Sequence, residues 1–190
     1  MSKIILASSS IYRQELLKRL PIKFISTSPN INEARKNDEN FGDLARRLSN
    51  EKAEAISIKN PSAFVIGSDQ TSEFNNKEVR KPLSLDKAFI QLNELSGQTL
   101  NFYSGVCLKN AQKNISVDEV VKFSVTYKKL SEDQIKNYLK FEDPSQCVGS
   151  IKSEGLGITL LEEIRCNDPT AVIWLPLIKL SQMFEKYGVI

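Results

Sequence analysis

The sequence predicts an α/β fold: a mixed sheet with flanking helices. Short apolar runs alternate with amphipathic helical stretches, and two alternating runs are close enough to form a hairpin. Hairpin strands are antiparallel, so the sheet should combine parallel and antiparallel pairs. With 190 residues, 41% of them hydrophobic, we expect one domain over residues 1–190.

The chain should open with a buried strand over residues 3–7 and a helix from about Ile11. Ser8, Ser9 and Ser10 lie between them and offer hydroxyl groups as helix caps. The N-terminal N–H groups and dipole of such a helix can also bind an anion. By itself the pattern favours simple capping, because serine caps are common, and it leaves the anion site open.

A strand over residues 22–26 and a long helix over residues 41–58 should follow. In that helix Lys52 falls on the same stripe as Leu44 and Leu48. A lysine on an apolar stripe either extends its ammonium group to solvent or points it into a site. The pattern leaves both alternatives open.

An apolar run over residues 63–66 predicts a buried strand that ends at Gly67-Ser68-Asp69-Gln70. Asp69 should therefore lie at the carboxyl end of a strand, where ligand sites of open α/β sheets gather. The simpler alternative is that Asp69 only caps the following turn.

The second half of the chain should contain helices, a hairpin and a final capped helix. We expect a helix over residues 85–95, strands over 100–108 and 117–127, a helix opened by the capping-box pair Ser131 and Gln134, a strand over 158–161 and a helix after Pro176.

The chain has no histidine, which excludes nucleophiles that need a histidine base and metal sites built on imidazole. Carboxylates, cationic side chains and hydroxyls must carry any catalysis. Such groups suit magnesium or manganese and phosphate chemistry. The formal charge of only +3 gives no reason to expect long nucleic acid as a partner.

Nothing in the sequence directs the chain to a membrane or out of the cell. The opening apolar run is too short for a signal peptide, and the apolar stretch over residues 171–178 is too short to span a bilayer. The spacing of Cys107, Cys147 and Cys166 suits neither zinc nor a disulfide framework, so we expect buried reduced thiols. We therefore place the protein in the cytoplasm.

Several segments together resemble the Maf family of nucleoside triphosphate pyrophosphatases. In order they are Leu6-Ala7-Ser8-Ser9-Ser10 with Arg13 and Glu15-Leu16-Leu17, Asn32-Glu33, Glu51-Lys52-Ala53, Ile66-Gly67-Ser68-Asp69-Gln70, Lys81-Pro82, Leu95-Ser96-Gly97, Phe102-Tyr103-Ser104-Gly105, Lys152-Ser153-Glu154-Gly155, and Asp168-Pro169 through Leu175-Pro176-Leu177-Ile178. Each is weak alone, whereas the ordered set is specific. The resemblance implies two lobes on a long mixed sheet, an active site in a central cleft, and commonly a homodimer.

The resemblance also implies the reaction and its residues. Water attacks the α-phosphorus of a nucleoside triphosphate, with Asp69 as general base and Glu33 beside it at a divalent metal or the attacking water. The phosphates would be bound by Ser8, Ser10, Arg13, Lys52 and Lys81. A neighbouring carboxylate would raise the pKa of Asp69. Arg13 could instead be a surface residue.

Gly-Ser-Asp-Gln and Lys-Ser-Glu-Gly resemble the branch of the family that acts on 7-methyl-GTP rather than on dTTP and UTP. The family places Tyr12, Gln70 and Glu154 around the base. Tyr12 would stack on the cationic ring, and Glu154 would accept hydrogen bonds from N1–H and the 2-amino group. Glu154 could also be a solvated loop residue.

Two other functions stay open. One is the same chemistry on dTTP, UTP or another modified nucleotide. The other is a nucleotide-binding regulator of cell division with little turnover.

Three residues depart from the branch pattern. Tyr12 replaces a usual tryptophan and keeps an aromatic ring, and Ile151 replaces a usual phenylalanine, which would loosen the wall beside Glu154. Trp174 replaces a usual glycine, so the close backbone packing that a glycine permits is not expected near the last helix.

Overall fold

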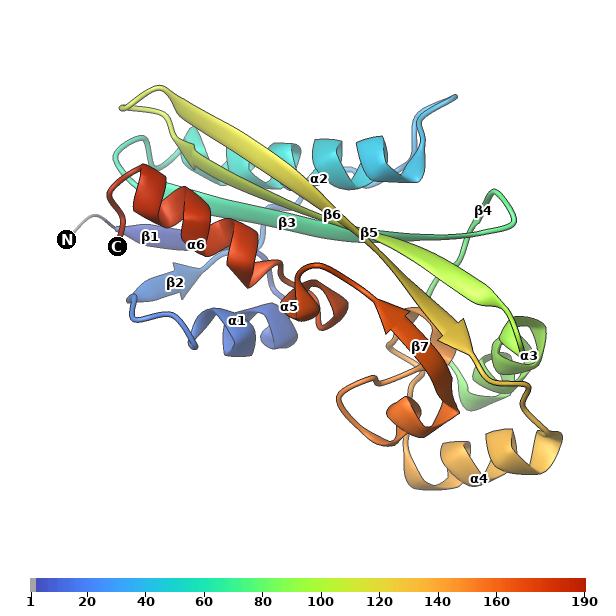
Figure 1. Ribbon diagram of the computed structural model, residues 1–190. Helices are drawn as coiled ribbons and strands as arrows, with labels where there is room; N and C mark the ends of the chain where they lie inside the picture. The colour runs from blue at the N-terminus through green and yellow to red at the C-terminus, as the bar shows by residue number, and fades with distance from the viewer. Residues whose placement is uncertain (1–2) are drawn as a thin grey trace. The chain divides into compact units, whose positions relative to one another are not determined.

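The computed structural model describes residues 3–190, in which seven strands form one mixed sheet with helices packed on it (Figure 1). The strands are β1 (Ile4–Ala7), β2 (Phe24–Ser26), β3 (Phe64–Phe74), β4 (Lys77–Glu78), β5 (Thr99–Asn110), β6 (Ile115–Tyr127) and β7 (Leu161–Arg165). The helices are α1 (Ile11–Leu17), α2 (Phe41–Ser57), α3 (Leu85–Leu95), α4 (Glu132–Phe141), α5 (Pro169–Val172) and α6 (Leu177–Lys186).

The strand order is β2-β1-β3-β5-β6-β7, and β4 pairs with β3. Strand β1 runs parallel to β2 and β3, whereas β3 with β4 and β6 with β7 are antiparallel. The predicted mixed α/β fold is therefore confirmed.

The chain forms two compact units. The first unit comprises the described residues up to Thr71 with Tyr103–Lys122 and Asn167–Ile190, and the second unit comprises Ser72–Phe102 and Phe123–Cys166. Strands β3, β5 and β6 contribute residues to both units.

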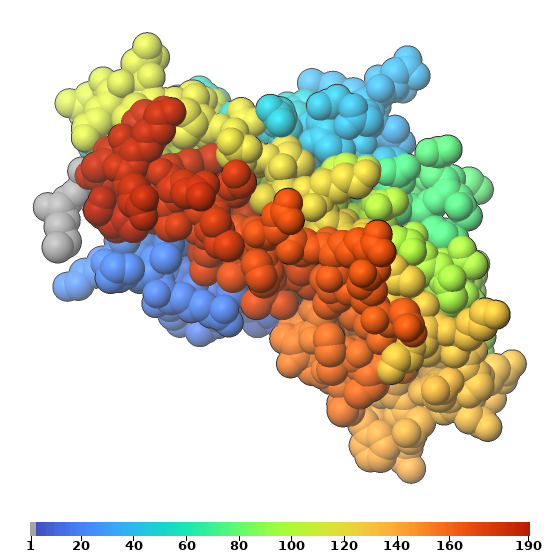
Figure 2. All heavy atoms as spheres, viewed as in Figure 1, coloured from blue at the N-terminus to red at the C-terminus, as the bar shows by residue number. Residues whose placement is uncertain are grey.

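The core of the first unit has two layers because side chains alternate between the faces of a strand. On one face, Ile4 and Leu6 of β1 pack with residues of α1 and α6. On the other face, Ile5 and Ala7 pack with Ala53 and Ile56 of α2. Figure 2 shows the C-terminal residues lying against the N-terminal segment, in agreement with the first of these layers.

Helix α2 packs directly on the backbone of the sheet at two glycines. A Cβ atom at Gly67 of β3 would lie 2.0 Å from the carbonyl oxygen of Ser49, and one at Gly105 of β5 would lie 2.4 Å from that of Ala45. Only glycine allows such an approach. The two glycines therefore determine how close the helix that carries Lys52 lies to β3.

The second unit is built around α3, α4 and the two short 3₁₀ turns Val148–Ser150 and Leu156–Leu160. Its core includes the stacked rings of Phe102 and Phe123, with centroids 4.8 Å apart. The buried hydroxyl of Tyr127 donates a hydrogen bond to the carbonyl of Gly149 at 2.8 Å. The predicted capping box of Ser131 and Gln134 is present at the start of α4.

Two boundary predictions are wrong. The run over residues 158–161 is not a strand: Leu156–Leu160 forms a 3₁₀ turn with Ile158 half-exposed, and β7 begins only at Leu161. The strand over residues 63–66 does not end at Gly67 but continues to Phe74, where its last two residues pair with β4. Its neighbour β5 comes from a distant part of the sequence, and the apolar run does not reveal such a contact.

Two expectations about the chain as a whole can be compared with the structure. Cys107 and Cys147 are buried thiols, as predicted, whereas Cys166 is partly exposed. Within residues 3–190, no helix is both long and apolar enough to cross a membrane.

Candidate active site

One lysine joins two carboxylates in the first unit. The ammonium group of Lys52, on α2, lies 2.6 Å from Oδ1 of Asp69 on β3 and 2.6 Å from Oε1 of Glu33 in the loop before α2. Lys52 and Asp69 are only 6% and 8% exposed, so the ion pair is nearly closed to bulk water. Because Lys52 is buried against these carboxylates, the alternative that it extends its ammonium group to solvent is excluded.

The prediction that Asp69 lies at the carboxyl end of a strand is wrong, because Asp69 sits in the middle of β3. The neighbouring strand β1, however, ends at Ala7, which pairs with Gly67. Asp69 therefore lies two residues beyond the last parallel pair, where the edge of the parallel sheet opens. The alternative that Asp69 caps a turn is wrong.

The turn after β1 brings two serines and an arginine together. Ser10 is the N-cap of α1 and accepts a hydrogen bond from the backbone N–H of Arg13, as predicted. The hydroxyl oxygen of Ser8 accepts hydrogen bonds from the N–H of Ser10 at 3.1 Å and from Nη1 of Arg13 at 3.5 Å. Arg13 is therefore part of this cluster and not a plain surface residue.

Charge also links Arg13 to the carboxylates. Burial lowers the pKa of the Arg13 guanidinium, whereas the charges of Asp69 and Glu33 raise it. Burial raises the pKa of Asp69 above its usual range, and the charges of Lys52 and Arg13 oppose that effect. The raised pKa agrees with our expectation, but the leading cause is desolvation and the charge of Glu33 contributes least.

Trp174 adopts a backbone conformation that suits glycine. Its φ angle is +94°, in the left-handed region where a bulky residue is strained. Its ring stacks on that of Tyr12, with centroids 5.7 Å apart, and its carbonyl oxygen accepts a hydrogen bond from Nε of Arg13 at 3.2 Å. In the described part of the chain, its buried indole Nε1 has no hydrogen-bond partner.

The segment around α5 completes the first-unit side of the site. The side-chain nitrogen of Gln70 donates to the carbonyl of Ala171 at 2.9 Å, which ties β3 to α5. Asp168 is 1% exposed and accepts hydrogen bonds from N–H groups of Thr170 in α5 and Ile178 in α6. The carboxylate thus caps two helices at once.

Lys81 and Glu154 belong to the second unit. Both side chains are exposed, and Glu154 lies in a turn. Burial raises the pKa of the Cys147 thiol to about 11, and the charges of Glu154 and Lys81 also act on it.

A Maf-like protein family model matches residues 3–187. The chain belongs to the Maf family. A 7-methyl-GTP pyrophosphatase of Nitrosococcus oceani is 43% identical over 97% of this chain and 93% of its own. The Colwellia psychrerythraea protein of the same name is 39% identical over 100% of this chain and 94% of its own, and that of Hydrogenovibrio crunogenus is 43% identical over 98% and 93%.

Among solved structures, the Staphylococcus aureus Ham1 protein aligns over 66% of this chain and 72% of its own, with 15% identity and a TM-score of 0.46. That likeness is too partial to add to the family assignment.

The acidic residues of this Maf chain can be tested against the expected divalent metal. Within residues 3–190, no group of three or more Asp, Glu, Cys or His side chains is placed to hold a metal ion by itself. Magnesium, however, commonly binds one or two carboxylates together with water and substrate phosphates. Asp69 and Glu33, drawn to a single ammonium group, provide such a pair, so the donor set fits a metal that binds with the nucleotide.

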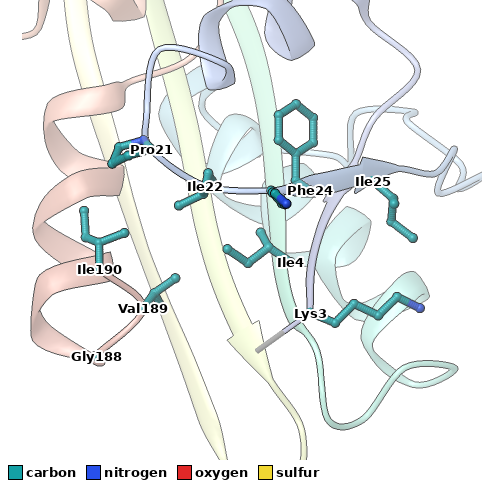
Figure 3. A pocket seen from close by; sticks show the side chains of 10 residues that line it. Lys3, Ile4, Pro21, Ile22, Phe24, Ile25, Gly188, Val189 and Ile190 are labelled. Atoms are coloured by element: carbon teal, nitrogen blue, oxygen red, sulfur yellow. The ribbon is translucent and has the colours of Figure 1, made fainter. Parts of the chain in front are cut away.

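A separate hollow of about 740 Å³ lies elsewhere in the first unit (Figure 3). It is lined mainly by apolar side chains of β1, β2 and the chain end: Lys3, Ile4, Pro21, Ile22, Lys23, Phe24, Ile25, Gly188, Val189 and Ile190. None of the predicted site residues lines it, and its walls offer neither a carboxylate side chain nor a hydroxyl. The hollow therefore contains none of the candidate catalytic groups.

Sequence reasoning missed three features of this Maf site. The first is the cap that Asp168 provides to α5 and α6, and the second is the contact of Trp174 with Tyr12, which joins segments more than a hundred residues apart. The third is Arg47, which binds the loop that carries Glu33. For Asp168, the Asp-Pro pair before an apolar helix was an available capping signal.

Proposed function

We propose that this chain hydrolyses 7-methyl-GTP to 7-methyl-GMP and diphosphate with the help of magnesium or manganese. The observation that carries the proposal is the buried Asp69–Lys52 pair with Glu33 on the same ammonium group. It is supported by the pyrophosphatase names of relatives about 40% identical over nearly the whole chain.

Asp69 is the proposed general base. Its Oδ1 accepts a hydrogen bond from Lys52, so we assign to Oδ2 the proton of the attacking water. The water oxygen bonds to the α-phosphorus, the bond from that phosphorus to the bridging oxygen breaks, and diphosphate leaves. Asp69 and Glu33 would also hold the metal, which supplies positive charge to the phosphate oxygens.

The remaining cations and hydroxyls bind the triphosphate. We assign Ser8, Ser10 and Arg13 to one phosphate, because they already share hydrogen bonds at the turn after β1. Lys81 is assigned to the others. Lys52 already contacts two carboxylates, so its proposed role is to orient these carboxylates toward the triphosphate, including the general base Asp69.

We assign recognition of the nucleobase to Tyr12, Gln70 and Glu154. Tyr12 is 38% exposed and braced by Trp174, so one ring face can stack on the cationic 7-methylguanine. Gln70 uses its nitrogen on Ala171, which leaves its oxygen for the base or for a bond that holds Glu154. Glu154 would accept the two donors of the guanine edge.

The proposal is tested by measuring pyrophosphate release from 7-methyl-GTP, GTP, dTTP and UTP with magnesium or manganese, and with a chelator. We expect kcat/KM for 7-methyl-GTP to exceed that for dTTP and UTP by roughly tenfold or more, the value of one charged hydrogen bond. A preference for dTTP or UTP would instead assign the chain to the branch of the family that acts on those nucleotides. Tight nucleotide binding without turnover would favour a regulator.

The substitution Glu154→Ala tests whether Glu154 recognises the nucleobase. We expect kcat/KM for 7-methyl-GTP to fall roughly ten- to a hundredfold, because a hydrogen bond to a charged group contributes about 1.5–3 kcal/mol. Activity on UTP should be unchanged or improved, since its carbonyl groups repel a carboxylate. Equal losses on both nucleotides would mean that Glu154 supports catalysis and does not read the base.

We further propose that the protein works in the cytoplasm as a homodimer, as its family resemblance implies. Light scattering after size exclusion should then give about twice the chain mass of 21.4 kDa. A mass equal to one chain would reject the dimer.

A further inference from the structure

Glu33 has to be held in place by something other than regular structure. It lies in the segment between β2 and α2, in which residues 27–40 form neither helix nor strand. Its side chain is 58% exposed and forms an ion pair with the ammonium group of Lys52. An exposed ion pair of this kind contributes little to the order of a loop.

Arg47 binds this loop at two points. Its Nε and Nη2 atoms donate to the two carboxylate oxygens of Glu39, at 2.6 and 2.9 Å. Nη2 also donates to the carbonyl oxygen of Ala34 at 2.9 Å, directly after Glu33 in the chain. Nη1 donates to Glu51 of the same helix at 3.0 Å, which orients the guanidinium group.

The contacts of Glu39 close the loop on itself. Its carboxylate also accepts a hydrogen bond from the N–H of Lys36 at 3.1 Å, and its carbonyl accepts one from Nε of Arg35 at 2.6 Å. The side chains of Arg47 and Glu39 are 16% and 10% exposed. A bidentate pair this well shielded is much stronger than a surface ion pair.

We propose that Arg47 is a positioning residue for the reaction: by binding Glu39 and the carbonyl of Ala34, it places Glu33 against Lys52. Helix α2 then holds the loop at Arg47 and receives the Glu33 carboxylate at Lys52, so both carboxylates of the site are positioned from one helix. The inference rests on the proposed function only for the role of Glu33.

The test compares Arg47→Lys with Arg46→Lys. Lysine keeps the charge but cannot form the bidentate pair and the carbonyl bond together. Arg46 is a matched control on the same helix, because it is 54% exposed and pairs with Asp118, away from the loop. We expect Arg47→Lys to lower kcat for 7-methyl-GTP roughly tenfold with KM within about threefold, since misplaced groups reduce turnover more than binding. Arg46→Lys should match the wild type.

Coupling to Glu33 separates positioning from a merely structural role. In a Glu33→Gln background, Arg47→Lys should cause little further loss, because the carboxylate that it positions is gone. If the two losses multiply, or if Glu33→Gln keeps full turnover, the inference is overturned.

Limited digestion with trypsin provides a readout that needs no substrate. The loop contains Arg35 and Lys36, and the substitution at Arg47 leaves the number of cleavage sites unchanged. We expect Arg47→Lys to speed cleavage after these residues several-fold and Arg46→Lys to leave it unchanged. Equal cleavage in all proteins would overturn the inference even if the chain hydrolysed no nucleotide. Should Arg47→Lys fail to fold, Glu39→Gln takes its place with the same expected directions.

Discussion

Four charged side chains balance one another at the candidate site. Asp69 and Glu33 contribute two negative charges, and Lys52 and Arg13 contribute two positive ones. Buried charges persist in a protein only when they are paired, because their desolvation costs several kcal/mol each. Removing one member therefore leaves an uncompensated charge as well as a missing chemical group.

Asp69→Asn should lower kcat by about a hundredfold or more, the scale expected for a general base. Nucleotide affinity should change much less, because the proposed phosphate and base contacts remain. Affinity can be followed by fluorescence of Trp174, the only tryptophan, which stacks on Tyr12. A thermal melt checks the fold, and turnover within a few-fold of the wild type would reject Asp69 as the base.

At the scale of elements, α2 does the most to assemble the site. It approaches β3 at Gly67, presents Lys52 to Asp69, and holds the preceding loop through Arg47. Its apolar residues bury one side of the helix against the sheet. The position of the proposed catalytic groups thus depends on how this one helix packs.

Gly67→Ala tests that dependence. The new Cβ would lie 2.0 Å from the carbonyl oxygen of Ser49 and 2.8 Å from the N–H nitrogen of Ala53. Helix α2 must then shift, and we expect a stability loss of about 1–3 kcal/mol together with a lower kcat. Gly42→Ala in the same helix is the control, since its nearest neighbours are side chains at 3.3 Å. Urea unfolding and turnover unaffected by Gly67→Ala would show that the close approach is dispensable.

The ion pair of Arg47 with Glu39 makes the stability of the protein depend on pH in a definite direction. Hydrogen bonding to Arg47 lowers the pKa of Glu39 below its ordinary 4.5. The stabilisation of the folded state by the Glu39 carboxylate is therefore complete above pH 4.5. It is lost as the pH falls toward and through the lower pKa that Glu39 has in the folded state. Between pH 7 and pH 3, Glu39→Gln should lose less stability than the wild type, by about 1 kcal/mol in urea unfolding. Parallel pH curves for the two proteins would contradict this.

At the scale of the whole molecule, the proposed site residues are divided between the two compact units. Lys52, Asp69 and Arg13 belong to the first unit, whereas Lys81 and Glu154 belong to the second. Strands β3, β5 and β6 contribute residues to both units. We propose that the two units act as one domain over residues 1–190.

Removal of the metal should abolish activity and leave the fold intact. Lys52 and Arg13 already compensate the carboxylates, and the cores of both units are apolar. We therefore expect a chelator to stop pyrophosphate release reversibly, while the thermal melt stays a single transition with Tm within a few degrees. Collapse of the melt in chelator would reveal a structural metal instead.

The sequence by itself determined the α/β class, most helix bounds and the residue types of the chemistry. Those features depend on local physics: Ser10 and the Ser131–Gln134 pair cap the N–H groups next to them in the chain, and periodicity marks buried faces. The absence of histidine alone restricted the chemistry to carboxylates and cations. The family resemblance then assigned their roles.

Only the tertiary structure decided which groups meet. Strand β3 lies beside the distant strand β5, and the partners of Lys52 are Asp69, 17 residues away, and Glu33. The stack of Trp174 on Tyr12 joins opposite ends of the chain. Such contacts depend on how whole elements pack, and a pattern of neighbouring residues carries no information on the distance between side chains far apart in sequence.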